Sequence, residues 1–292
     1  MSLALIFDKQ RDDTVGVYFE RACHELGVAV RHFWVREASA IPERHDLYLR
    51  IDHGDYREDL PAHLRPNGFY AVDTHLAKSW KRIRRLAAHY DQVYCAQRQA
   101  AEAFSHGMWV PLACDLPLHG RIVRPLCWDV AFVGTDGGVP RKFYLQALRE
   151  RYPKSFLGHA PHTQLGAIYS QAKIGFNYSI RNDLNMRIFE ILSAGSLLIT
   201  NRLSHDDLAR LGLREGHEYV GYRGPRELMD AIDYYLHHEA ERQAIAQRGM
   251  HHVQRHHTYR HRLEQILRHA QPSLLPVSSS GDHVGQEISC GS

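Results

Sequence analysis

Short apolar runs rich in Val, Ile, Phe and Tyr alternate along this chain with segments whose apolar residues recur at helical spacing. This alternation is typical of strands joined by crossover helices in a parallel sheet, so it predicts an α/β fold. In the first half it predicts strands over residues 3–7, 29–34, 47–51, 70–73, 93–96 and 109–111, and helices over residues 15–26, 77–90 and 97–105.

A segment of little periodicity separates this series from a second one. Residues 114–128, CDLPLHGRIVRPLCW, contain two prolines and one glycine, a composition typical of a linker between domains. After it we predict strands over residues 130–134, 155–157, 174–178, 196–200 and 218–221, and helices over residues 141–151, 164–172, 186–194 and 226–237. The helical pattern continues over residues 240–270, with breaks expected near Gly249 and Thr258. At about 150 residues per domain, the chain divides into domains over residues 1–120 and 121–270.

Composition narrows the class of protein further. Lys and Arg number 36 and Asp and Glu number 33, and the resulting net charge of +3 is too small for a dedicated nucleic-acid wrapper. No apolar run approaches the length of a bilayer span, and the five cysteines form no CxxC pair. The residues MSLALIFDKQ lack the basic region, long apolar region and cleavage site of a signal peptide. We therefore expect a cytoplasmic chain with reduced thiols. The Ser-, Gly- and Pro-rich residues 271–292 are expected to be disordered, and a role as an attachment or expression tag stays open for them.

Residues 174–201, IGFNYSIRNDLNMRIFEILSAGSLLITN, hold the densest set of candidate functional groups. A strand, a polar loop, a helix and a second strand follow one another, so the loop lies at the carboxyl edge of a sheet, where open α/β folds bind ligands. The helix that starts near Asn185 would attract a phosphate to its N-terminus. Arg187 and Glu190 share one face of this helix and would serve an anionic group and ribose hydroxyls, or else form an ordinary surface ion pair.

The glycine-rich stretch FVGTDGGVPR, residues 132–141, is a second candidate. Gly134, Gly137 and Gly138 would let backbone amides approach a diphosphate, with Thr135 as a further binding residue in the turn, and Arg141 would add charge-assisted hydrogen bonds. An ordinary turn between a strand and a helix is the alternative. Asn177 ends a strand at the same edge, where it would meet a ligand or cap the following loop. His159 would line the base or sugar, or lie in solvent.

Two side chains after a strand of the first half are candidate general bases. Asp73 and His75 could remove a proton from an acceptor hydroxyl, whereas the alternative is that such residues cap a strand end. The nearby acidic run RIDHGDYRED invites a metal-site interpretation, but the chain has no DxD triplet and we predict no metal site.

Several of these segments, taken in order, resemble a known family. NDLNMRIFEILSAGSLLIT, EYVGYRGPRELMDAIDYYL, ERQAIAQRGMHHV and HHTYRHRLEQIL are similar to glycosyltransferases of the spore maturation protein (CgeB-like) type, as are FYAVDTHLAKSWKRI, DQVYCAQRQAAEAF and WVPLACD. The resemblance covers most of residues 47–267. It implies a GT-B fold, in which two Rossmann-like domains face a central cleft and a helical C-terminal segment follows.

The resemblance also implies a division of labour. The second domain would bind a nucleotide diphosphate-sugar donor without a further cofactor or a metal ion, and the first would face the acceptor. Related retaining enzymes carry two Glu eight positions apart, and Glu190 corresponds to the second, a ribose contact. Asn182 stands at the first position, with Asp183 beside it, so the stereochemical outcome stays open.

The expected activity is therefore sugar transfer to a polysaccharide, a protein, a small molecule or a modified nucleobase. The Gly134 turn, Arg141, Arg187 and the helix from Asn185 would stabilise the departing diphosphate, while Glu190 holds the ribose. A GT-B nucleotide-sugar epimerase and a non-catalytic nucleotide-sugar or polymer-binding module are the alternatives. DNA binding is the weakest of the candidates.

Overall fold

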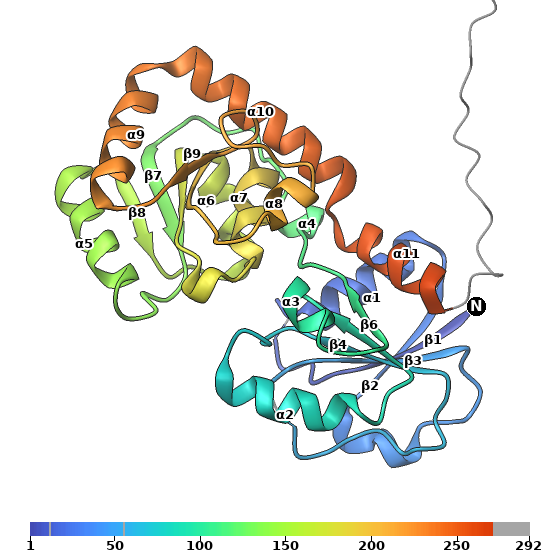
Figure 1. Ribbon diagram of the computed structural model, residues 1–292. Helices are drawn as coiled ribbons and strands as arrows, with labels where there is room; N and C mark the ends of the chain where they lie inside the picture. The colour runs from blue at the N-terminus through green and yellow to red at the C-terminus, as the bar shows by residue number, and fades with distance from the viewer. Residues whose placement is uncertain (12, 55, 271–292) are drawn as a thin grey trace, which may run out of the picture.

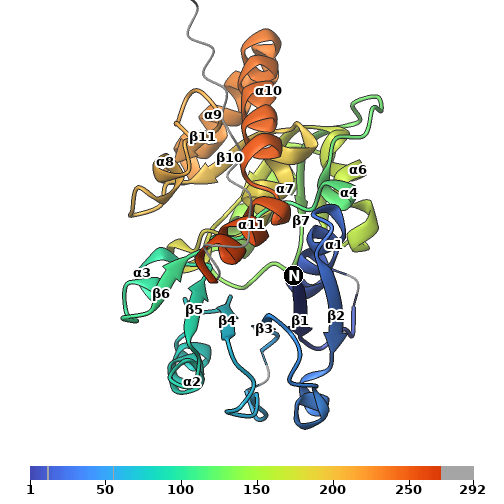
Figure 2. The same ribbon diagram turned by 90° about the vertical axis from the view of Figure 1, so that its right-hand side faces the viewer.

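The computed structural model describes residues 1–11, 13–54 and 56–270, which form two α/β domains joined at one side (Figures 1 and 2). Residues 271–292, which were expected to be disordered, lie outside the described residues. Asp55 of the acidic run also lies outside them. Each domain is built on a sheet whose paired strands are all parallel, which confirms the predicted α/β class.

The first sheet has six strands in the order β2-β1-β3-β4-β5-β6. Its strands are β1 (Ser2–Ile6), β2 (Ala29–Phe33), β3 (Leu47–Ile51), β4 (Asn67–Ala71), β5 (Gln92–Cys95) and β6 (Gly107–Trp109). The helices are α1 (Val15–Glu25), α2 (Ala77–Ala87) and α3 (Arg98–Ala101), with a 3-10 helix over Val35–Ala40. Strands β3 and β4 are buried along their whole length, as expected for central strands of a sheet covered on both faces.

The second sheet has five strands in the order β11-β10-β9-β7-β8. Its strands are β7 (Trp128–Val133), β8 (Ser155–Gly158), β9 (Ala172–Asn177), β10 (Leu197–Asn201) and β11 (Val220–Tyr222). Its helices are α5 (Arg141–Arg151), α6 (Leu165–Ser170), α7 (Met186–Ala194), α8 (Asp207–Arg210) and α9 (Pro225–His237), with 3-10 helices over His162–Gln164 and Ile180–Asn182. Helix α7 packs closely on β9, because a Cβ atom on Gly175 would lie 2.3 Å from Ile191.

The chain passes between the domains twice. The first passage contains the short helix α4 (Leu116–His119), and the second joins α10 (Glu239–His256) to α11 (Tyr259–Ala270). The passages touch where Cys114 and Thr258 form a parallel β-bridge. Helix α11 lies within the predicted second domain, residues 121–270, but packs against α1 of the first domain. The predicted domain boundaries at residues 120 and 270 therefore stay a prediction.

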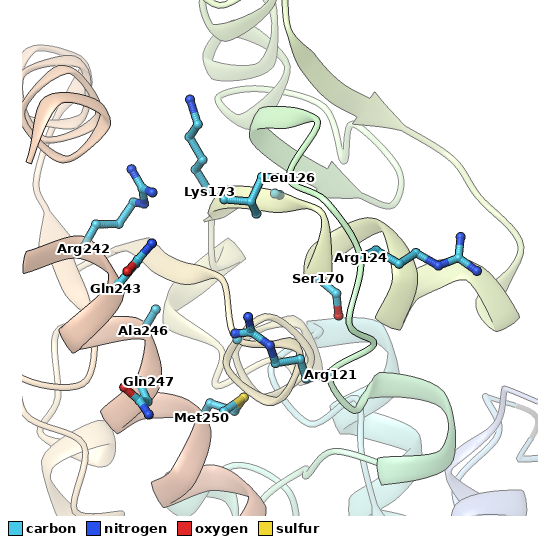
Figure 3. A pocket seen from close by; sticks show the side chains of 12 residues that line it. Arg121, Arg124, Leu126, Ser170, Lys173, Arg242, Gln243, Ala246, Gln247 and Met250 are labelled. Atoms are coloured by element: carbon cyan, nitrogen blue, oxygen red, sulfur yellow. The ribbon is translucent and has the colours of Figure 1, made fainter. Parts of the chain in front are cut away.

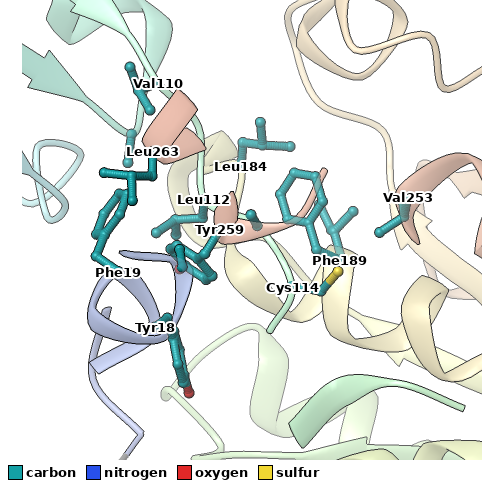
Figure 4. Packing of buried hydrophobic residues seen from close by; sticks show 14 of the residues in the cluster. Tyr18, Phe19, Val110, Leu112, Cys114, Leu184, Phe189, Val253, Tyr259 and Leu263 are labelled. Atoms are coloured by element: carbon teal, nitrogen blue, oxygen red, sulfur yellow. The ribbon is translucent and has the colours of Figure 1, made fainter. Parts of the chain in front are cut away.

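A shared apolar core fills the space around these passages. Tyr18 and Phe19 of α1 contact the ring of Tyr259 in α11, and Phe189 of α7 belongs to the same cluster (Figure 4). The buried side chain of Arg262 donates hydrogen bonds to the carbonyl oxygens of Pro111 and Leu112, and burial lowers its pKa to about 10. These contacts tie the C-terminal helix to the first domain.

Two expectations about helices were wrong. Helix α10 runs through Gly249 without a break, because the missing side chain lets it approach the carbonyl oxygen of Glu218, which a Cβ atom would meet at 2.5 Å. Helix α3 ends at Ala101 and does not continue to residue 105. No helix among the described residues is both long and apolar enough to span a membrane.

Candidate active site

Arg187, in the first turn of α7, lies at the carboxyl edge of the second sheet. Its Nε donates to the carbonyl oxygen of Val133 at 3.0 Å and its Nη1 to Oδ1 of Asn177 at 3.2 Å. The guanidinium carbon lies 4.4 Å from the centre of the Phe132 ring, within cation–π range. These contacts hold the cation in one position before any ligand binds.

Arg141, the first residue of α5, approaches the same ring from the neighbouring loop. Its Nη1 donates to the carbonyl oxygen of Thr135 at 3.1 Å, while its buried Nε has no partner. Its guanidinium lies 5.7 Å from the Phe132 ring centre, and burial and the charge of Arg187 both lower the pKa of Arg141. Two cations held this close repel each other, so an anion bound between them would be stabilised.

The glycine-rich loop serves these arginines. Gly134, Gly137 and Gly138 have φ angles of 142°, 63° and 74°, and a Cβ atom on Gly134 would lie 2.5 Å from Nη2 of Arg187. The expectation that the Gly134 amide faces a diphosphate was wrong, because this N–H donates to the carbonyl oxygen of Gly158 at 2.9 Å. Glycine is required here to make room for Arg187.

Asn177 and Asn185 belong to a polar network beneath the arginines. Asn177 is fully buried, and its Nδ2 donates to the hydroxyls of Ser179 at 3.2 Å and Thr200 at 3.0 Å. With its Oδ1 bound to Arg187, Asn177 positions that cation and does not face the open edge. Asn185, which precedes α7, donates to the Ser179 hydroxyl at 3.1 Å and leaves a buried Oδ1 without a partner.

Glu190 lies one turn further along α7 and is buried. Burial raises its pKa to about 7, against the opposing effect of Arg187. The alternative of a surface ion pair between Glu190 and Arg187 was wrong, because Glu190 is not on the surface. Its carboxylate faces the interdomain passage, where Nε2 of His119 lies 3.8 Å from Oε1.

Sequence patterns did not point to His119. The backbone N–H of Asp115 donates to its Nδ1 at 3.0 Å, so the ring proton sits on Nε2, which faces Glu190. Burial lowers the pKa of His119 to about 3, which keeps the ring neutral. The linker position of His119 gave no periodic or motif signal, and only the tertiary fold brings it to α7.

Asp73 and His75, the predicted bases of the first domain, face two different cavities. Asp73 lines a cavity of about 590 Å³ between residues 7–11 and 13–16, the ends of β3 and β4, and Met186 of α7. Burial and the neighbouring Asp52 raise the pKa of Asp73. Asp52 itself accepts hydrogen bonds from the N–H groups of Val72 and Gly54, so it is a strand-end cap.

His75 lines a smaller cavity of about 330 Å³ that also draws on both domains. Its Nε2 lies 4.0 Å from Oδ2 of Asp183, whose pKa is raised by burial. The preceding Arg181 and Asn182 have φ angles of 55° and 60°, a strained backbone of the kind that clusters at functional sites. Asn182 and Asp183 both line this cavity, so which of them corresponds to the first acidic position stays a prediction.

A third cavity lies at the opposite end of α7, behind the candidate site. It has a volume of about 410 Å³ and is lined by Arg121, Arg124, Lys173 and Arg242 among others (Figure 3). His159 is exposed on its loop. Within the described part of the chain, no three His, Cys, Asp or Glu side chains are grouped to hold a metal ion.

Two parallel-sheet domains whose charged groups meet across a cleft are the architecture of the GT-B fold. Residues 119–268 match the family model described as glycosyl transferase-like, and the chain belongs to this family. The predicted glycosyltransferase class is thereby confirmed. No curated protein matches the sequence significantly.

Solved structures support the fold. The Anabaena protein Alr3699/HepE in complex with UDP and glucose has a TM-score of 0.67 at 10% identity, covering 91% of this chain and 98% of that chain. Phage T4 BGT with UDP-glucose has a TM-score of 0.59 at 11% identity, covering 92% and 99%. T4 BGT with UDP and Mn²⁺ gives 0.60 at 11% identity, covering 93% and 100%. At these identities the likeness concerns the fold alone.

Proposed function

We propose that this glycosyltransferase uses a UDP-sugar as its donor and transfers the sugar to an acceptor hydroxyl held by the first domain. The observation that carries the proposal is the convergence of Arg141 and Arg187 on the Phe132 ring, one helical turn from Glu190. The Anabaena and T4 structures, of similar fold, contain UDP or UDP-glucose.

In the donor complex, Arg141 and Arg187 bind the diphosphate together with the N-terminal end of α7. Glu190 accepts hydrogen bonds from the ribose hydroxyls. The neutral ring of His119, with Nε2 3.8 Å from Oε1 and without a hydrogen-bond partner, packs beside the carboxylate and restricts its orientation. The two arginines stabilise the negative charge that develops on the leaving diphosphate. Because these cations are already in position, they need not rearrange during the reaction.

We assign the general base to Asp73. Its carboxylate lines the cavity that reaches Met186, the first residue of α7, and a raised pKa makes a carboxylate a stronger base for a hydroxyl proton. His75 and Asp183, in the adjoining cavity, bind acceptor hydroxyls. Both cavities take residues from both domains, so closure of the cleft assembles them.

Three finer properties complete the proposal. The CgeB-like subtype is supported by the ordered motifs over residues 47–267, and a cytoplasmic location by free thiols at Cys23, Cys95, Cys114 and Cys127. The arginine pair supplies positive charge at the diphosphate, so turnover should not require a metal ion. Because T4 BGT has been crystallised with UDP and Mn²⁺, turnover should be compared with EDTA and with added Mn²⁺.

A thermal-shift panel tests the donor site. UDP, GDP, dTDP and CDP sugars are compared on the wild type, on Arg187→Ala and Glu190→Ala, and on Arg226→Ala, whose side chain is 97% exposed. We expect UDP-sugars to give the largest shift, lost in the first two variants and kept in the third. Undiminished shifts in both site variants would place the donor elsewhere. Stabilisation without release of UDP to any acceptor would favour a binding module, and donor isomerisation without acceptor an epimerase.

A further inference from the structure

Helix α2 carries a concentration of positive charge that the composition of the chain conceals. Its sequence AKSWKRIRRLA contains five cations, Lys78, Lys81, Arg82, Arg84 and Arg85, and no acid. All five are exposed, and none forms an ion pair within the described residues. Their combined charge exceeds the +3 of the entire chain.

Packing does not explain this charge. Ile83, Leu86 and Ala87 bury the apolar side of α2 in the core of the first domain, whereas the five cations are exposed. Lys78 repels Lys81 three positions away, and Lys81 repels Arg85 four positions away, and such like-charged pairs destabilise a helix. A helix that keeps them without acidic partners is suited to an anionic partner.

The N-terminal end of α2 opens into the cavity of His75 and Asp183. Trp80, in the first turn of α2, forms one wall of that cavity, and the guanidinium of Arg84 lies 5.9 Å from its ring centre. Oγ1 of Thr74, Nδ1 of His75 and Oδ1 of Asp183 are buried polar atoms without a hydrogen-bond partner. Buried polar atoms are rarely left unpaired, and these three offer hydrogen bonds to a ligand with several hydroxyl groups.

We propose that α2 binds an acidic polysaccharide acceptor, one sugar of which enters the cavity lined by His75 and Asp183. This inference rests on the proposed sugar transfer, since the acceptor must offer a hydroxyl group as nucleophile. A polymer of uronic acids presents hydroxyl groups and a carboxylate in every unit, so one chain satisfies both the cationic helix and the polar cavity. DNA offers anions but hydroxyl groups only at its ends, and RNA offers one 2′-hydroxyl per nucleotide, fewer than a uronic acid unit. A membrane surface would require apolar side chains, which α2 itself keeps buried.

Binding of a fluorescently labelled oligogalacturonate, measured by anisotropy at increasing NaCl concentration, tests the proposal. The Lys81→Gln/Arg85→Gln double variant should bind roughly tenfold more weakly, with a shallower dependence on salt, because fewer counterions are released. Glutamine keeps helix propensity at these exposed positions, so the fold is retained. The matched control is Arg121→Gln/Arg124→Gln in the other basic cavity (Figure 3), which should bind like the wild type.

Four results would overturn the proposal. They are no binding of oligogalacturonate by the wild type, equal binding of a neutral dextran oligomer, unchanged binding by the α2 variant, and tighter binding of a single-stranded oligonucleotide or of anionic vesicles. The thermal shift with UDP-glucose is measured on the same samples. If UDP-glucose gives no thermal shift with the wild type, the proposed donor is wrong but the oligogalacturonate result still stands. If the α2 variant shows the wild-type thermal shift, the substitutions have changed only the acceptor side.

Discussion

The carboxyl edges of the two sheets face the same cleft but differ in how their polar groups are held. On the second sheet, hydrogen bonds to Val133 and Asn177 fix Arg187 in place, although buried atoms of the neighbouring Arg141 and Asn185 have no partner. On the first, buried polar atoms of Thr74 and His75 have no partner. A ligand of constant structure, such as a nucleotide, is best bound by groups fixed in advance, whereas unpaired groups depend on the ligand to satisfy them.

The largest effect expected is on the acceptor side. Asp73→Asn removes the proposed base and should lower kcat by about 10²–10⁴. Donor binding, followed by the thermal shift with UDP-glucose, should not change. Because the pKa of Asp73 is raised, the wild-type rate should rise with pH as this carboxyl ionises, at a higher pH than for an ordinary Asp. His75→Gln is the comparison variant, and a deeper loss of kcat there would assign the base to His75 instead.

On the donor side, Arg187→Ala should reduce kcat/KM by about 10²–10³, since a preorganised cation at the leaving group is lost. UDP release in the presence of acceptor measures this effect. Arg226→Ala provides the control for loss of a charge alone. If Arg187→Ala kept wild-type turnover, the contrast between a fixed donor edge and an unpaired acceptor edge would no longer hold.

The pH dependence of stability should reflect the buried Glu190. Its pKa is raised from 4.5 to about 7 on folding, so the folded state favours the protonated form. Its contribution is complete below the unfolded pKa and is lost as pH rises from about 4.5 to about 7, by about 3 kcal/mol. Unfolding by urea at pH 4 to 8 should show this loss in the wild type and a smaller one in Glu190→Gln. Parallel profiles would show that Glu190 ionises freely in the folded protein.

The smallest effect is expected at His119, which touches Glu190 and not the donor. His119→Phe should raise KM for the donor by about threefold to tenfold with kcat nearly unchanged, because it weakens ground-state binding. His119→Gln keeps an N–H donor near the carboxylate and should restore most of the affinity. A fall in kcat without a change in KM would argue against a positioning role.

Much of the fold could be predicted because local sequence determines it. The strands found at residues 47–51 and 197–201 lie within one residue of those expected. Short apolar runs bounded by turn signals are typical of buried strands. Gly249 was misleading because its role is tertiary: the glycine allows α10 to approach the Glu218 carbonyl. A propensity for breaking helices does not reveal that use.

The candidate residues could be proposed from the sequence, but their contacts could not. Arg187 and Glu190 share α7, yet Arg187 bonds to Val133 and Asn177 whereas Glu190 faces His119. His75 and Asp183 lie 4.0 Å apart because of the way the two domains meet. The sequence around neither residue indicates this contact. Net charge likewise averages over the chain and concealed the five cations of α2.

The paired passages between the domains restrict how the molecule can move. Cys114 accepts a hydrogen bond from the N–H of Tyr259 and donates one to the carbonyl oxygen of His257, so the two passages form a single hinge. A relative motion of the domains that keeps both hydrogen bonds would have to pivot at this point. Across the cleft, Gln97 bonds to the Leu184 backbone and Arg98 to Asp207. For product to leave and new substrate to enter, the contacts of Gln97 with Leu184 and of Arg98 with Asp207 would have to break as the domains rotate apart.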